Sequence, residues 1–140
     1  MSSLTLAQAN QIIAVALATA RKRGHRPMGV VVLDEAGHLR AAQREDGASM
    51  FRIDIATGKA WAAVAMGASS RTLLERSRDN PLFYGSLPAT AQGKFLAQTG
   101  AVLIKSGGQI IGAVGASGGS GDEDEAICIA GVEAAGLQHT

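Results

Sequence analysis

Residues 107–125, GGQIIGAVGASGGSGDEDE, decide the fold of this chain. An apolar run broken by glycines ends in a glycine-rich turn, and four consecutive acidic residues follow. This order predicts a strand that turns sharply into a helix, with Ser120 as N-cap and Glu123 completing a capping box. Residues 101–106 are equally apolar, so we expect 101–117 to form a β-hairpin.

The glycine-rich turn lacks the features of a nucleotide site. Its spacing does not match the dinucleotide fingerprint, and the Lys-Ser or Lys-Thr of a phosphate loop is missing. The carboxylates of residues 122–125 already satisfy the helix dipole and repel a second anion. Consecutive helical residues point about 100° apart, so at most two of these carboxylates converge. We therefore expect a charged helix start and no metal site.

The rest of the chain reads as helices around a second hairpin. Thr5 and Gln8 match a capping box, and apolar residues recur at helical spacing up to the basic residues before Gly24. A β-branched run, a turn at 34–37 and a second apolar segment predict a hairpin. The later elements are expected as a helix over 49–66, a short helix over 69–80, and a long ordered loop with at most a helical turn over 81–100.

This order of elements favours one α+β domain over residues 1–140. The strands and helices do not alternate as they do in parallel βαβ folds, so an antiparallel sheet with helices on its faces is the simplest arrangement. A chain of 140 residues is long enough for one buried core and too short for two ordinary ones.

Composition narrows the possible partners. Hydrophobic residues make up 46% of the chain but aromatic residues only 4%, with 18 glycines, so the core packs thinly and favours burial against a second subunit. The formal net charge of +1 gives no field that would attract nucleic acid. Cys128 is the single cysteine, which leaves it as a small buried helix residue without a disulfide partner.

The first 24 residues do not match a signal peptide or a membrane span. The basic residues 21–23 follow the apolar stretch instead of preceding it, and polar residues interrupt that stretch. We expect a cytoplasmic protein without a membrane partner.

Four segments in the same order resemble the GlcG/HbpS-like family, the haem-binding or haem-degrading domain related to the C-terminal domain of PduO-type proteins. They are LTLAQANQIIAVALATA, VVVLDEAGHLRAAQREDGAS, IATGKAWAA and GQIIGAVGASGGSGDEDEAICIAGVEA. The resemblance covers nearly the whole chain. It departs at residues 99–104, TGAVLI, where the family pattern has Gly-Gly-x-Pro-Ile and this chain lacks the proline that shapes the pocket rim.

The resemblance implies a profilin-like α-β-α sandwich with a central antiparallel sheet of about five strands. It also implies homo-oligomers, from dimers up to octamers. Family members are described as haem-binding, some of them in haem- or redox-responsive sensing systems, and others function in glycolate or diol catabolism.

Haem iron takes an imidazole, thiolate, thioether or phenolate ligand. His25 and His38 are the candidate imidazoles, and His25 is preferred because Arg23 and Arg26 beside it could pair with the propionates. Both histidines also fit ordinary solvated turn positions. We expect the cofactor in an apolar slot between the final hairpin and a helix or a neighbouring subunit, lined by Gly115, Ser117, Gly118 and Gly119.

A second group of residues suggests an enzyme instead. Arg44, Asp46 and Lys59 match recurring positions of the family pattern, and they are the residue types that anchor a carboxylate and move a proton. Arg44 would hold a small hydroxy or keto acid while Asp46 or Lys59 acts as base in a lyase or isomerase reaction. The same three residues also fit a structural ion pair between the hairpin and the following helix.

Haem binding and small-carboxylate chemistry therefore both remain open. The haem-binding hypothesis needs an apolar hollow, and the enzyme hypothesis needs a compact polar pocket of about 300 Å³. The 81–100 segment, with its aromatic residues, would serve as a lid in either case.

Overall fold

A computed structural model describes residues 3–140 of the chain. The helices in this part are α1 (Leu6–Lys22), α2 (Phe51–Met66), α3 (Ser70–Asp79), α4 (Pro81–Thr90) and α5 (Gly121–Ala134). The strands are β1 (Gly29–Asp34), β2 (Leu39–Arg44), β3 (Ala101–Ser106), β4 (Gln109–Ser117) and β5 (Gln138–His139).

The strands form one antiparallel sheet in the order β2-β1-β4-β3-β5. Strand β4 lies at the centre, between β1 and β3, and is buried from Ile111 to Ser117. Strand β2 is an edge strand, and most of its residues are exposed. The two hairpins expected from the sequence are therefore joined by pairing of β1 with β4, which the sequence pattern did not specify.

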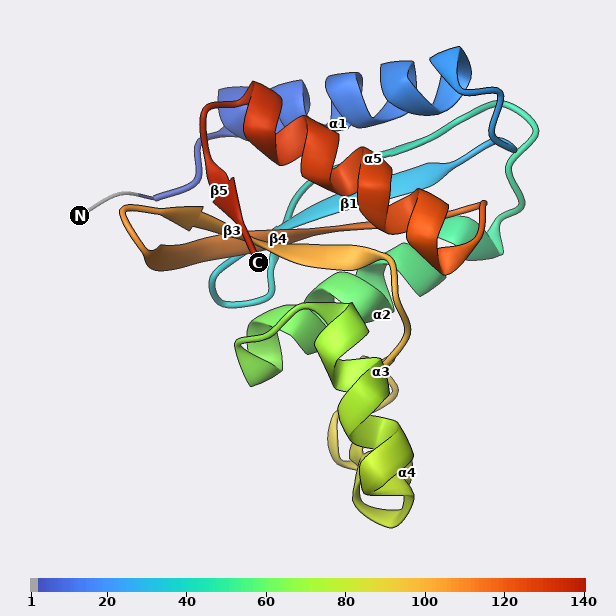
Figure 1. The fold of residues 1–140 in the computed structure, drawn as a ribbon, viewed down its shortest axis with the longest axis vertical. Coiled ribbons are helices and arrows are strands. Elements are labelled where there is room, and N and C mark those ends of the chain that lie inside the picture. Colours follow the sequence, from blue (N-terminus) through green and yellow to red (C-terminus); the bar gives the residue numbers. More distant parts are fainter. Residues whose placement is uncertain (1–2) are drawn as a thin grey trace.

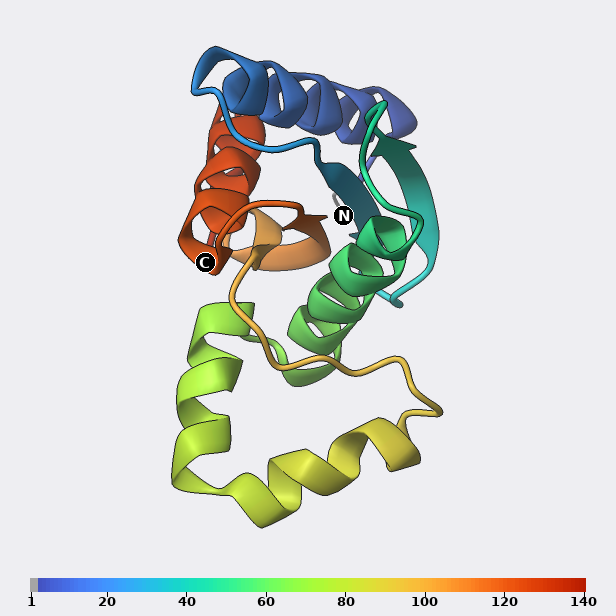
Figure 2. The same cartoon turned by 90° about the vertical axis from the view of Figure 1, so that its right-hand side faces the viewer.

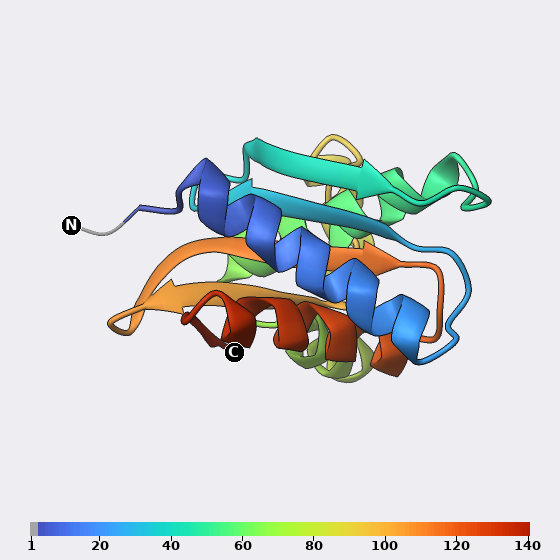
Figure 3. The ribbon, with the colours of Figure 1, turned by 90° about the horizontal axis from the view of Figure 1, so that it is seen from above.

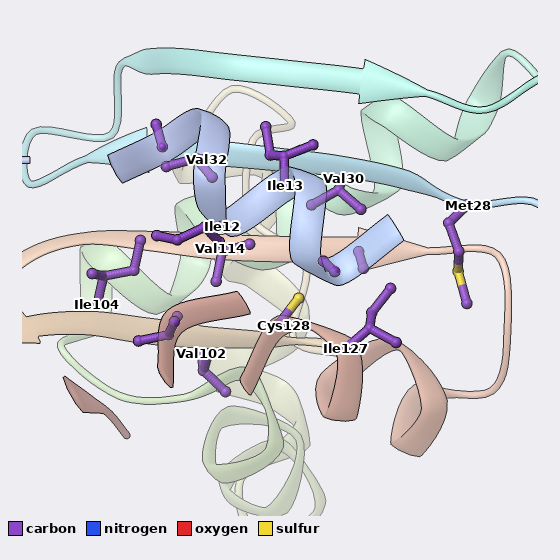
Figure 4. Close-up of a cluster of buried hydrophobic side chains, with 14 of the residues drawn as sticks. Ile12, Ile13, Met28, Val30, Val32, Val102, Ile104, Val114, Ile127 and Cys128 are labelled. Carbon is purple, nitrogen blue, oxygen red and sulfur yellow. The ribbon is translucent and has the colours of Figure 1, made fainter. Parts of the chain in front are cut away.

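Helices cover both faces of the sheet. Helices α1 and α5 lie side by side over one face, and α2 lies against the other (Figures 1 and 3). Between α1, α5 and the sheet lies an aliphatic core with interdigitated side chains (Figure 4). Its labelled members include Ile12, Ile13, Val30, Val32 and Val114, all of them fully buried. The α-β-α sandwich predicted from the sequence is confirmed.

Glycine lets backbones touch in both layers. A Cβ atom on Gly115 of β4 would overlap the carbonyl oxygen of Ala56 in α2, and one on Gly131 of α5 would overlap that of Ile12 in α1. With few aromatic residues available, the core is filled by this close approach. Its energetic basis is the dispersion and desolvation gained by tight packing.

Helices α3 and α4 form an arm that projects from the α2 side of the sheet (Figure 2). Residues 81–90 are helical, so the expected loop over 81–100 is wrong for its first half. Pro81 occupies the first turn, where its missing N–H has no intrahelical partner. The buried Tyr84 packs against Phe95 with ring centroids 6.3 Å apart, and this tertiary contact stabilises a segment that its prolines and glycines make look irregular.

No helix within residues 3–140 has both the length and the hydropathy needed to cross a bilayer.

The close contact between α2 and β4 predicts that Gly115→Ala destabilises the protein by about 1–3 kcal/mol, because the added methyl group must push α2 away from the sheet. Urea unfolding followed by circular dichroism measures the change. Gly85→Ala is the matched control, since a Cβ atom there meets nothing within 4 Å. That exposed helical position should gain about 0.5–1 kcal/mol. Equal stability of the Gly115→Ala variant and the parent would contradict the packing described here.

Candidate functional site

An open, mostly apolar hollow lies on the α2 face of the sheet beside the β1–β2 hairpin. Its volume is about 510 Å³. We call it the hairpin cavity; the lining residues that matter for the argument are Leu33, Leu39, Ile53, Trp61, His38 and Lys94. Apolar walls with a small number of polar groups are typical of small-molecule sites.

Local turn chemistry places His38 on this cavity. The Asp34 carboxylate accepts hydrogen bonds from the backbone N–H groups of Ala36 and His38, each at 2.9 Å. Gly37 adopts φ +80°, and a Cβ atom there would approach the indole nitrogen of Trp61 to 3.1 Å. The turn is thus fixed by an Asx-type motif and rests against the tryptophan ring. Any ligand in the cavity would meet an imidazole beside an aromatic wall.

Arg44 and Asp46 line a different depression, of about 450 Å³, together with Arg21 and Glu45. The Arg44 guanidinium donates to the carbonyl oxygen of Ala48 at 2.9 Å, which holds the chain after β2. Arg21 pairs with Glu45 at 2.9 Å. Its lining includes two guanidinium groups and two carboxylates beside Leu17 and Pro27.

Lys59 lies apart from that depression. Its side chain is buried, and Nζ donates to the Ala116 carbonyl at 3.0 Å and to the Asp124 carboxylate at 3.1 Å. The structure therefore brings Arg44 and Asp46 together but gives Lys59 a different partner. A structural ion pair involving Lys59 is present, but it joins α2 to α5 and not to the hairpin.

Asp124 is a residue that the sequence argument missed. It is 2% exposed, and its second carboxylate oxygen accepts from the Gly119 N–H at 2.9 Å. Burial raises its pKa above the ordinary carboxyl value, while Lys59 and the Gly119 hydrogen bond act in the opposite direction. Gly100 makes room for the pair, because a Cβ atom there would lie 2.6 Å from Lys59 Nζ.

Each carboxylate of the acidic stretch has a polar partner. Arg71 of α3 pairs with Asp122 and Glu125. Glu123 completes the capping box with Ser120, and the Ser120 N–H bond lowers its pKa. The charged helix start expected from the sequence is confirmed, and the structure adds that it ties α5 to three other segments.

His25 is one of those partners. Its Nδ1 lies 3.1 Å from the Glu123 carboxylate, and only 12% of its side chain is exposed. His25 therefore lies against the start of α5, away from the residues that line the hairpin cavity.

The residues expected to line a cofactor slot lie in the sheet interior or its following turn: Gly115, Ser117 and Gly118 are buried, and Gly119 is half-buried. Helix α2 covers Gly115 through Ala56. The Ser117 hydroxyl accepts from Arg52 Nη1 at 3.3 Å. At Gly115 the strand surface expected to border a slot is thus covered by the chain's own helix, because bare backbone in a strand packs equally well against a neighbouring helix.

Cys128 is fully buried in α5, as expected, and burial raises the pKa of its thiol far above the ordinary value. It donates a long hydrogen bond of 3.6 Å to the Gly100 carbonyl. This protonated thiol is a packing group.

Two cavity residues, Trp61 and Lys94, were also missed. The only available signal for Trp61 was that it is the single tryptophan of a chain with few aromatic residues. Lys94 follows Gly93 in a segment that the sequence marked only as a lid.

Comparison with known proteins identifies the family. The model of the family described as haem degrading protein HbpS-like matches residues 4–133. The chain belongs to this HbpS-like family. The HbpS-like fold is also found in the crystal structure of a double mutant of HbpS from Streptomyces reticuli, which is 29% identical with a TM-score of 0.84 and covers 96% of this chain and 88% of its own.

Two further relatives concern PduO. The complex of PduOC with haem is 27% identical to this chain, with a TM-score of 0.88 and 98% of both chains covered. The corrinoid adenosyltransferase PduO of Salmonella typhimurium is 32% identical over 98 residues, which is 70% of this chain and 29% of PduO. The match therefore spans less than a third of the PduO sequence, and the remainder of PduO has no counterpart in the match. The expected family is confirmed.

The buried pair predicts that Lys59→Met destabilises the protein by about 3–5 kcal/mol, because the Asp124 carboxylate is left in the interior without its cation. Adding Asp124→Asn should restore most of the loss, since the amide oxygen still accepts from Gly119. Chemical unfolding measures both variants, and failure of the second change to restore stability would contradict the pairing.

The same variant gives a pH signature. Without Lys59 the pKa of Asp124 in the folded state rises further, so the native state binds its proton at a pH where the unfolded chain does not. The stability of Lys59→Met relative to the parent should therefore increase as pH falls from 7 towards the ordinary carboxyl pKa of about 4. The Lys59→Met, Asp124→Asn double variant should lack this trend.

Proposed function

We propose that this protein binds haem in the hairpin cavity, with the His38 imidazole as the iron ligand. The observation that carries the proposal is a histidine held by turn geometry on an apolar hollow, in a chain of the HbpS-like family. The complex of a structural relative with haem supports the choice of cofactor.

The residues of the cavity suit the chemistry of haem. Imidazole is a common axial ligand of haem iron, and apolar side chains and an indole ring suit the porphyrin face. The volume of about 510 Å³ falls within the range of roughly 300–1,000 Å³ for small-molecule sites. Haem, when bound, supplies redox chemistry at iron. The chain's own part is to hold the ring, orient the iron and limit the access of water.

His38 is favoured over His25 on the contacts of each side chain. His25 lies against Glu123 with only 12% of its side chain exposed, so little of the imidazole is accessible to a ligand. His38 is exposed on the cavity, and only its backbone is engaged in the turn. Haem binding through the His38 imidazole therefore breaks no hydrogen bond or ion pair that this side chain makes within the described residues.

The alternative of a small hydroxy or keto acid retains Arg44 and Asp46 in their shared depression. Lys59 does not line it, so the base of that reaction would have to be Asp46. A cytoplasmic location stays a prediction of the sequence analysis.

Titration with haemin tests the proposal. The parent protein should shift and sharpen the Soret band at micromolar concentration, whereas His38→Ala should lose the axial-ligand spectrum. His25→Ala is the matched control and should keep it. Ala42→Phe, which fills the cavity from β2, should weaken binding without loss of folding, because Ala42 is exposed and lines the hollow.

The outcomes separate the parts of this proposal. A parent protein that does not change the haemin spectrum would remove haem binding altogether. A spectrum that survives His38→Ala but is lost in His25→Ala would keep haem and reject the site.

A homo-oligomer is part of the same proposal. The arm carries exposed apolar side chains, with Leu82 89% and Phe83 49% exposed, and α4 has no charged residue. Sedimentation equilibrium should give a mass that is a multiple of 14.3 kDa. The Leu82→Ser, Phe83→Ser variant should shift the protein towards the monomer. The proposal of a homo-oligomer rests on the exposed apolar side chains of the arm, which contacts between subunits would bury. A parent protein that is monomeric at about 100 μM would therefore overturn it.

A further inference from the structure

Lys94 lies where two hollows meet. It lines the hairpin cavity and also the adjacent hollow of about 370 Å³ formed by Phe51, Asp54 and Gly58, and Thr57 borders both. Among the residues that line the hairpin cavity, Lys94 carries the permanent charge, and there is no carboxylate. Within residues 3–140, its ammonium group makes no ion pair.

The backbone fixes Lys94 from its N-terminal side. Gln92 and Gly93 adopt φ +56° and +80°, which turns the chain sharply after α4. The Gly93 N–H donates to the Pro88 carbonyl at 2.7 Å, and the Lys94 N–H donates to the Ala91 carbonyl at 3.2 Å. These bonds make the approach to Lys94 a defined turn.

Gly58 fixes the segment from the other side. The Leu96 N–H donates to the Gly58 carbonyl at 3.3 Å, and a Cβ atom on Gly58 would lie 3.0 Å from Leu96 Cβ. Phe95, which lies between Lys94 and Leu96 in the chain, is buried in a cluster with Tyr84 and Leu73. The segment around Leu96 therefore packs directly against the backbone of α2, because Gly58 has no side chain. Figure 2 shows it returning from the arm, beneath α2, to the sheet.

We propose that Lys94 binds the carboxylate of the cavity's ligand, and that Gly58 is a positioning residue that holds Lys94 there. The inference rests on the proposed function and makes it more specific: the site takes an apolar planar molecule that carries a carboxylate, and it selects for that charge. The apolar wall binds the ring, and the lysine at the junction of the two hollows meets the acid group.

Haemin and its dimethyl ester distinguish these roles, because the ester keeps the ring and iron but lacks both negative charges. The parent protein should bind haemin about fivefold more tightly than the ester, the effect of one partly exposed ion pair. In Lys94→Met this preference should disappear while the ester affinity stays unchanged. Lys22→Met, at the end of α1 on the opposite face of the sheet, is the matched control and should keep the preference.

Gly58→Leu tests the positioning role. The larger side chain must displace the segment around Leu96, so the preference for haemin should fall as it does in Lys94→Met. The His38-dependent Soret band should persist, which a general loss of structure would not allow. Raising the salt concentration from about 0.05 to 0.5 M should reduce the preference in the parent protein and leave Lys94→Met unaffected.

The result separates two failures. If neither haemin nor the ester binds, the proposed function is wrong. If both bind but Lys94→Met keeps the parent's preference for haemin, the haem site stands and the role of Lys94 is overturned. A Gly58→Leu variant that binds the ester normally and keeps the full preference would overturn the positioning role alone.

Discussion

The direct contact between α2 and the central strand is the constraint on which the rest of the structure depends. Gly115 has no side chain, so the helix backbone at Ala56 rests on the sheet itself. At that distance α2 brings the Lys59 ammonium group within hydrogen-bond reach of the Ala116 carbonyl in β4 and places Trp61 beside the first hairpin. A helix held away by ordinary side chains would place neither residue where it is found.

The Lys59–Asp124 pair joins the two helical layers around the sheet. Burying two charges is costly, and the cost is offset here by mutual attraction and by hydrogen bonds to the backbone of Ala116 and Gly119. Such a pair contributes little net stability but penalises any arrangement in which one partner is buried alone. The pair therefore joins the start of α5 directly to α2.

The hairpin cavity exists because α2 does not cover the edge of the sheet. Strand β2 is largely exposed, and its apolar residue Leu39 is 65% exposed because α2 does not reach it. The turn at His38 and the segment at Lys94 close the hollow from two sides with polar groups. An edge strand of this kind normally carries protecting features. Here the uncovered apolar surface lines the hairpin cavity.

The sequence by itself determined helices α1, α2, α3 and α5, the two hairpins, both capping boxes and the layered α+β fold, because those signals are local patterns of apolar spacing, turns and caps. It also gave the family through motif order. Only the tertiary structure decided the partner of Lys59, 65 positions away, the helical state of residues 81–90, and the place of the hollow. Each of these depends on which side chains meet across the fold, and spacing along one segment carries no information about a contact with another.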